Sequence, residues 1–207
     1  MRQKSGRILQ RIDGYVNQRE YAGELVVLST STGSSNSTSI PTSMAIHLIN
    51  SFVISRIDYC NSLFAGLSAC QMERIQSILT YAVRIIYGRK YGHVTFLRDK
   101  LHWLCVPQRV KFKCCLLVCK ALQEQKPTYT RQFFINVTEV QRRSTLRWAA
   151  HNHLILPRSK IKFRNRSFSV DGPSALNSLP DDIRTSPSLI VFKNRIKTHL
   201  FRESYSS

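Results

Sequence analysis

Eight Lys and Arg residues crowd the stretch from Arg142 to Arg166, and no Asp or Glu interrupts them. Such side chains neutralise phosphate groups, and rings such as those of Trp148, Phe163 and Phe168 can stack on unpaired bases. The stretch therefore predicts contact with nucleic acid through phosphates, with little recognition of base edges. A solvated basic rim on a buried strand, with the rings in the core, is the alternative. The eight cations are Arg142, Arg143, Arg147, Arg158, Lys160, Lys162, Arg164 and Arg166.

The charge of the whole chain points the same way. Its 207 residues include 31 Lys and Arg but only 12 Asp and Glu, which gives a formal net charge of +19. An excess of this size is typical of proteins with a polyanionic partner. No apolar run is long enough to cross a bilayer, so we expect nucleic acid and no membrane as the partner. Further predicted contacts lie in the middle of the chain, at Arg74, Arg84, Arg89, Lys90, Arg109, Lys111 and Lys113.

Acidic residues that could support catalysis are scarce. A two-metal polymerase or nuclease needs clustered carboxylates that hold ions about 4 Å apart, and Asp181 and Asp182 are the only adjacent pair. Because they follow Pro180, they are best explained as first-turn charges that complement a helix dipole. No phosphate-binding glycine loop or nucleophile motif occurs. We therefore expect no catalytic residue, no cofactor and no small-molecule substrate.

Cysteine and histidine raise the question of a zinc site. Cys114, Cys115 and Cys119 share one predicted helix, and the last two have the spacing of one ligand pair. The second pair would have to be His151 and His153, which lie too close together for that pattern. Buried thiols are common core residues. We expect these thiols to pack in the core and no metal to bind, with zinc as the alternative.

The expected location follows from the cysteines and the N-terminus. The cysteine spacing does not resemble a disulfide framework, which favours reduced thiols. The opening sequence MRQKSGRILQ is charged and is followed by no apolar run, so it does not predict a secretory signal. We expect an intracellular protein, in the nucleus or outside it, and not a secreted one.

Hydrophobic periodicity predicts a mostly α fold. A first helix should cover residues 45–57, and a second should begin at Ser68, which heads a capping-box pattern, and end at Gly88. A short helix over residues 95–101 and a longer one behind Pro107 should follow. The residues expected to face inward are Ala45, Leu48, Ile49, Phe52, Val53 and Ile57 on the first helix, Met72, Ile75, Ile78, Leu79, Ala82, Ile85 and Ile86 on the second, and Val110, Cys114, Leu117, Val118 and Ala121 on the last.

The pattern changes in the C-terminal third. Residues 141–170 mix β-branched, aromatic and basic residues around Pro157, which predicts a small β element of two or three short strands. The sequence GPSALNSLPDDIR predicts a short helix and a turn. Ser186 and Pro187 should begin a final amphipathic helix. On it Leu189, Phe192, Ile196 and Leu200 should face inward, and Lys193, Arg195, Lys197 and Arg202 should face solvent.

These patterns divide the chain into three regions. Residues 1–42 form a divergent N-terminus with a Ser/Thr-rich linker, which we expect to be largely disordered because its composition cannot offset the entropy of ordering. Residues 43–140 form a helical region. Residues 141–207 form a basic C-terminal extension with short strands and a final helix.

Six segments in this order carry a family resemblance: VISRIDYCNSLFAGLS, ERIQSILTYAVRIIYG, LHWLCVPQRVKFKCCLLVCKAL, RSTLR, LPRSKIKFRNRSFSVDGPSALNSLP and SPSLIVFKNRIKTHLF. From about Ser43 to Arg202 the chain resembles the C-terminal region of non-LTR, LINE-type retrotransposon reverse transcriptases of the jockey-like group. The resemblance implies a helical thumb-like bundle that grips a primer–template duplex. It also implies a basic extension that helps to hold RNA or target DNA.

The same resemblance implies what this region lacks. In such elements the metal-binding aspartates of the polymerase palm and the endonuclease lie upstream, and residues 1–40 do not resemble the end of a palm. Cys105 and Leu176 stand where the family usually has proline and tryptophan. We therefore expect a fragment that is no enzyme and at most a non-catalytic nucleic-acid-binding module. A non-functional orphan fragment, or a protein-interaction module with apolar helix faces, is the alternative.

Overall fold

The computed structural model describes residues 41–88, 93–123, 128–140, 153–157 and 167–205. These residues are mostly helical, which confirms the predicted mostly α fold. The chain divides into two compact units. Unit 1 combines Met1–Tyr59 with Ser68–Val106, and unit 2 combines Cys60–Leu67 with Pro107–Ser207. Among the described residues the first helix begins at Thr42, and the boundary expected at residue 141 lies outside them.

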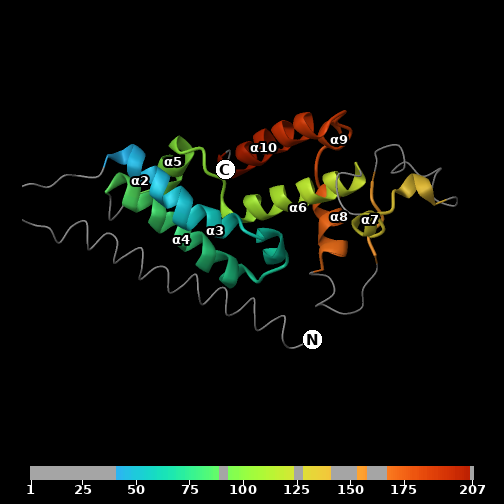
Figure 1. The fold of residues 1–207 in the computed structure, drawn as a ribbon, viewed down its shortest axis with the longest axis horizontal. Coiled ribbons are helices and arrows are strands. Elements are labelled where there is room, and N and C mark those ends of the chain that lie inside the picture. Colours follow the sequence, from blue (N-terminus) through green and yellow to red (C-terminus); the bar gives the residue numbers. More distant parts are fainter. Residues whose placement is uncertain (1–40, 89–92, 124–127, 141–152, 158–166, 206–207) are drawn as a thin grey trace, which may run out of the picture. The chain divides into compact units, whose positions relative to one another are not determined.

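Unit 1 is a set of helices around one long helix. The helices are α2 (Thr42–Ile49), the π-helical segment η1 (Asn50–Ile54), α3 (Ser55–Asp58), α4 (Ala69–Tyr87) and α5 (Val94–Lys100). The α2 and η1 segments lie along α4, and α5 packs against α4 as well (Figure 1). The α4 helix therefore organises the unit.

The α4 helix forms as its sequence predicts. The Ser68 N–H donates to Gln71 Oε1 at 3.4 Å, and the Ser68 side chain accepts from the Gln71 N–H, so both interactions of the expected capping box are present. Gly88 ends the helix in the left-handed conformation at φ 61°. The buried face consists of Ile75, Ile78, Leu79, Ala82, Val83 and Ile86, so the predicted stripe is confirmed with Val83 added and with Met72 and Ile85 half-buried.

The first helix departs from its predicted register. Leu48 is 38% exposed and Phe52 is 58% exposed, although both were expected to face inward. For Phe52 the reason is η1, since a π-helical turn holds more residues than an α turn and shifts the positions within and after it. Leu48 precedes η1, and nothing in the structure explains its exposure. Ile54, which the α pattern left out, is buried instead, together with Ile49 and Ile57.

Two helix starts also differ slightly from the predicted ones. The α5 helix begins at Val94 behind His93, so Thr95 lies within its first turn. The last helix begins behind Ser188, whose Oγ accepts a hydrogen bond from the Val191 N–H at 3.3 Å. Ser188, and not Ser186, therefore caps that helix, because its hydroxyl accepts from an N–H group of the first turn that has no carbonyl partner within the helix.

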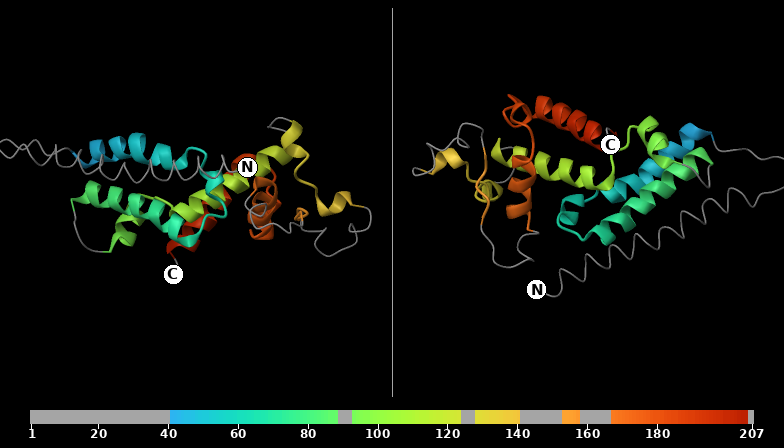
Figure 2. Two further views of the ribbon diagram at one scale, coloured as in Figure 1. Left: turned by 90° about the horizontal axis from the view of Figure 1, so that it is seen from below. Right: turned by 180° about the vertical axis from the view of Figure 1, so that it is seen from behind.

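Unit 2 is built on two long antiparallel helices. The α10 helix (Leu189–Tyr205) lies beside α6 (Val106–Leu122) and runs in the opposite direction (Figures 1 and 2). Shorter elements complete the unit: η2 (Asn61–Phe64), α7 (Thr128–Arg131), η3 (Val137–Glu139), α8 (Phe168–Asn177) and α9 (Asp181–Arg184). Phe192, Ile196 and Leu200 of α10 are buried as predicted, as are Val110, Cys114, Val118 and Ala121 of α6, while Leu189 and Leu117 are half-buried.

The small β element expected in residues 141–170 needs correction where the structure describes it. Among the described residues there is no strand, and a single isolated bridge pairs Asn136 with Leu154. The residues from Phe168 onward are helical, because burial of Leu176 on α8 outweighs the β propensity of Phe168 and Val170. The rest of that range lies outside the described residues.

Candidate nucleic-acid interface

The predicted contact residues fall into two groups. Ten of them lie outside the described residues: Arg89, Lys90, Arg142, Arg143, Arg147, Arg158, Lys160, Lys162, Arg164 and Arg166. The structure places the remaining five, Arg74, Arg84, Arg109, Lys111 and Lys113, on α4 and α6.

The two arginines of α4 differ in their availability. Arg74 is exposed in the first turns of the helix. Arg84 is half-buried near its end, and its Nε is buried without a hydrogen-bond partner among the described residues. Ten positions separate the two, so they lie nearly three turns apart along the helix. Arg74 is therefore the cation of α4 that a large ligand can reach.

The three predicted contact residues on α6 also differ in their surroundings. Arg109 and Lys113 are half-buried and lie four residues apart, on one side of the helix. Lys111 lies on the side that faces α10, with its Nζ 3.6 Å from a carboxylate oxygen of Glu203. Lys111 is therefore less available to a ligand than its place among the predicted contacts suggests, because Glu203 of α10 partly neutralises its charge.

The eight cations fall into two basic runs, residues 142–147 and residues 158–166. The described residues next to these runs are joined by hydrogen bonds. The Val137 N–H donates to the His153 carbonyl at 3.0 Å, and the Ile155 N–H donates to the Ile135 carbonyl at 2.9 Å. Asn177, at the end of α8, accepts from the Leu154 N–H at 2.9 Å and donates to its carbonyl at 2.8 Å. The Asn177 side-chain amide pairs with both backbone polar groups of Leu154, as the backbone of a neighbouring strand would.

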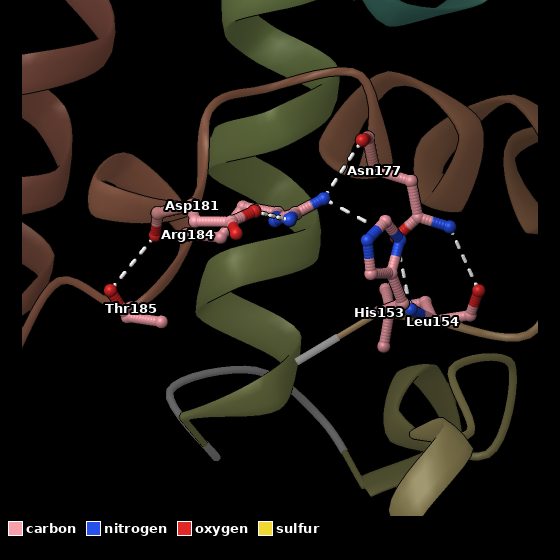
Figure 3. A network of polar contacts seen from close by, with 6 residues as sticks. All are labelled: His153, Leu154, Asn177, Asp181, Arg184 and Thr185. Carbon is pink, nitrogen blue, oxygen red and sulfur yellow. Dashed lines mark hydrogen bonds and ion pairs between the residues drawn. The ribbon is translucent and has the colours of Figure 1, made fainter. Parts of the chain in front are cut away.

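Arg184 extends this anchor to α9 (Figure 3). Its side chain is 3% exposed, and its Nη1 donates to the Asn177 carbonyl at 2.9 Å. The same nitrogen lies 3.4 Å from Nδ1 of His153, and Nη2 forms an ion pair with Asp181. We call His153, Leu154, Asn177, Asp181 and Arg184 the anchor network. Asp181 thus serves the start of α9 and the anchor network, as the first-turn interpretation predicted.

The other end of the second basic run is fixed in the same unit. Ser167 precedes α8, and its carbonyl accepts from the Val170 and Asp171 N–H groups at 3.0 and 2.9 Å. The Phe168 ring packs edge-on against Phe134, with centroids 5.4 Å apart. Phe168 is therefore a packing residue here, as the alternative interpretation of the aromatic rings held.

A close approach of α8 to α6 holds this end in place. A Cβ atom on Gly172 would lie 2.8 Å from Cγ2 of Val118. Since real Cβ contacts are longer than that, only glycine allows the two helices to lie this close. The α8 helix, which follows Ser167, is therefore packed tightly against α6 within unit 2.

Sequence reasoning missed two features of this region. The anchor network depends on Asn177 and Arg184, and no periodic pattern marks them. The α10 helix carries four exposed cations, Lys193, Arg195, Lys197 and Arg202. They were expected to face solvent, which is confirmed, but they were not counted as contacts, although their position opposite an apolar stripe was a usable signal.

Cys114 and Cys115 of α6 pack in the core as predicted, whereas Cys119 is half-buried. Cys114 and Cys115 are fully buried, and burial raises the pKa of Cys114 to about 12 and also raises that of Cys115. Burial raises the pKa of Cys119 to about 11. In the described part of the chain no group of three or more His, Cys, Asp or Glu side chains is arranged to hold a metal ion. His151 lies outside the described residues.

None of the described helices is both long enough and apolar enough to cross a membrane. No protein-family model matches the chain, and no curated protein and no solved structure matches it.

Proposed function

We propose that this chain is a non-catalytic nucleic-acid-binding module, derived from the thumb and post-thumb region of a LINE-type reverse transcriptase. It binds RNA or DNA inside the cell through backbone phosphates and recognises base sequence little. The observation that carries the proposal is the concentration of charge in residues 142–166, which hold eight cations and no acid, between segments that belong to unit 2. Described segments on every side of the two basic runs are hydrogen-bonded or packed into unit 2.

The contacts of the flanking segments matter because binding costs conformational entropy. Cations on a chain that is fixed at both ends lose less freedom on binding than cations on a free tail. Residues 135–137, which precede Arg142, pair with residues 153–155, which follow Arg147, and Pro157 and Ser167 flank residues 158–166. The same cations would otherwise repel one another, and a polyanion relieves that repulsion.

The test is the salt dependence of binding by the full-length chain. Fluorescence anisotropy with labelled duplex DNA and single-stranded RNA should show the logarithm of affinity falling linearly with the logarithm of salt, with a slope of about −0.9 per phosphate contacted on a duplex. The triple variant Arg158→Gln, Lys160→Gln, Lys162→Gln should lower that slope by about 1 per residue. A flat salt response by the natural chain would overturn the proposal.

The absence of catalysis is a separate part of the proposal. Asp181 is engaged by Arg184, and Asp182 is exposed in the first turn of a short helix, so this pair serves the structure. We expect no nucleotide incorporation in a primer-extension assay with Mg²⁺ or Mn²⁺. Extension by the purified chain, abolished by Asp182→Asn, would show that the chain is an enzyme.

An exposed apolar stripe favours a second candidate function, in which the chain packs on a partner protein. Met44, Leu48 and Phe52 follow one another at intervals of four residues and are 55%, 38% and 58% exposed. Exposed apolar residues in a row are typical of interaction surfaces. Light scattering separates the candidates: a monodisperse monomer favours self-sufficient nucleic-acid binding, whereas aggregation that Leu48→Ser and Phe52→Ser relieve favours the interaction module.

A further inference from the structure

The α10 helix presents a cationic surface to solvent. Four of its residues are exposed Lys or Arg, and Glu203 is its single acid. That acid is already partly neutralised, since its carboxylate lies 3.6 Å from Nζ of Lys111 on α6. The remaining charge of α10 is therefore positive along its length.

The buried stripe of α10 separates these cations into two flanks. Phe192, Ile196 and Leu200 face the core of unit 2. At 3.6 residues per turn, Lys193 and Lys197 lie together on one side of this stripe. Arg195 and Arg202, seven residues apart, lie on the other side. We call these pairs the lysine flank and the arginine flank.

The arginine flank lies next to acids. Arg195 Nη1 donates to the Asp182 carbonyl at 2.6 Å, and α9 packs against α10. The exposed residue Asp182 therefore borders this flank at Arg195, with Asp181 next to it in the chain. An approaching phosphate would be repelled by them, and Arg195 would have to give up a hydrogen bond.

The lysine flank has no such neighbours. Among residues 41–88, 93–123, 128–140, 153–157 and 167–205, neither Lys193 nor Lys197 forms a side-chain hydrogen bond or ion pair. An ammonium group on a flexible stem suits phosphate contacts that need no fixed orientation. Two such groups one helical turn apart can neutralise neighbouring phosphates of one strand.

We infer that the lysine flank of α10 is a binding site for nucleic-acid backbone phosphates, whereas Arg195 of the arginine flank holds α9 against α10 and Arg202 lies across the buried stripe from the bound strand. This inference rests on the proposed function and adds a second contact surface to residues 142–166. It assigns different roles to four cations on one helix, which a general attraction to net charge does not do.

The experiment compares two double variants of the full-length chain, Lys193→Gln with Lys197→Gln and Arg195→Gln with Arg202→Gln. Both remove two positive charges from the same helix. Anisotropy with labelled duplex DNA over a series of KCl concentrations gives the salt slope of each. The lysine variant should lower the slope by about 1 for each residue, and the arginine variant should leave it at the natural value.

Equal slopes for the two double variants would overturn the inference while leaving nucleic-acid binding in place. If the affinity of the natural chain for DNA does not change with KCl concentration, the proposed function itself is overturned. Because Arg195→Gln removes a hydrogen bond, the single variants Lys197→Gln and Arg202→Gln repeat the comparison without that change. Lys197→Gln should lower the slope by about 1 and Arg202→Gln should not, and equal slopes here too would overturn the inference.

Discussion

The α4 helix and the anchor network are held by different forces. The α4 helix packs through a regular stripe of aliphatic side chains, each of which contributes by leaving water. The anchor network is held by an amide and a guanidinium that bond to backbone groups of other segments. Aliphatic packing tolerates some rearrangement, whereas a buried polar group that loses its partner keeps the full cost of desolvation. The comparison therefore predicts how each region responds when one side chain is removed.

The largest effect is expected at the centre of the α4 stripe. Leu79 is fully buried, so Leu79→Ala should lower the free energy of unfolding by about 2–5 kcal/mol through lost burial and a cavity. Urea unfolding followed by circular dichroism measures the change. Leu63→Ala is the matched control, because Leu63 is 54% exposed and its truncation should cost about 0.5 kcal/mol or less. Equal losses at the two positions would contradict the burial of this helix face.

The anchor network should lose almost as much stability when the Asn177 side chain is removed. Asn177→Ala removes two hydrogen bonds and leaves the Leu154 N–H and carbonyl without these partners, at an expected cost of about 2–3 kcal/mol. Hydrogen exchange should rise at Leu154 and Ile155. Asn194→Ala, on the exposed side of α10, is the control and should change neither quantity. Unchanged protection of Leu154 in Asn177→Ala would show that the amide does not hold this segment.

The same contrast explains what the sequence could predict. The stripes of α4 and α10 repeat every three or four residues, so their buried faces and most of their boundaries were predictable. The π-helical turn at Asn50–Ile54 was not predictable, because no residue type in this segment indicates a change in the number of residues per turn.

The anchor network was hidden for a different reason. Asn177 and Arg184 find partners in a segment more than twenty residues away, and polar residues with distant partners leave no periodic trace. For the candidate interface, the excess of charge predicted where cations occur. It did not predict that Glu203 engages Lys111, or that Asp182 engages Arg195, since both contacts depend on how helices pack.

A smaller effect is expected at the start of α4, where a hydrogen bond and not burial is at stake. Ser68→Ala removes the hydroxyl of the capping box and should lower the free energy of unfolding by about 1 kcal/mol. Ser68→Asp keeps an acceptor and adds a charge that favours a helix N-terminus, so it should recover most of the loss. Urea unfolding of the three proteins gives the comparison. A loss in Ser68→Asp as large as in Ser68→Ala would show that the cap does not stabilise α4.

The smallest effect is expected at Asp171, a half-buried carboxyl in α8 that contacts Cys114 of the α6 core. Burial raises its pKa above the ordinary value of 3.8, and a hydrogen bond from the Cys114 thiol opposes that rise. The folded chain therefore holds this proton more tightly than the unfolded chain. The stabilisation is fully present below the ordinary pKa and is lost as the pH rises through the raised one.

Asp171→Asn should remove this dependence, because the amide keeps an oxygen near the thiol and carries no charge to desolvate. Relative to the natural chain, the variant should gain stability as the pH rises from about 4 toward 7, and the gain should vanish below the ordinary pKa. Urea unfolding over that pH range measures the difference. Asp182→Asn, at an exposed carboxyl, should show no such gain, because it loses a favourable charge at a helix start. A difference for Asp171→Asn that stays constant with pH would mean that this carboxyl is solvated, and that unit 2 packs its polar groups less tightly than the anchor network implies.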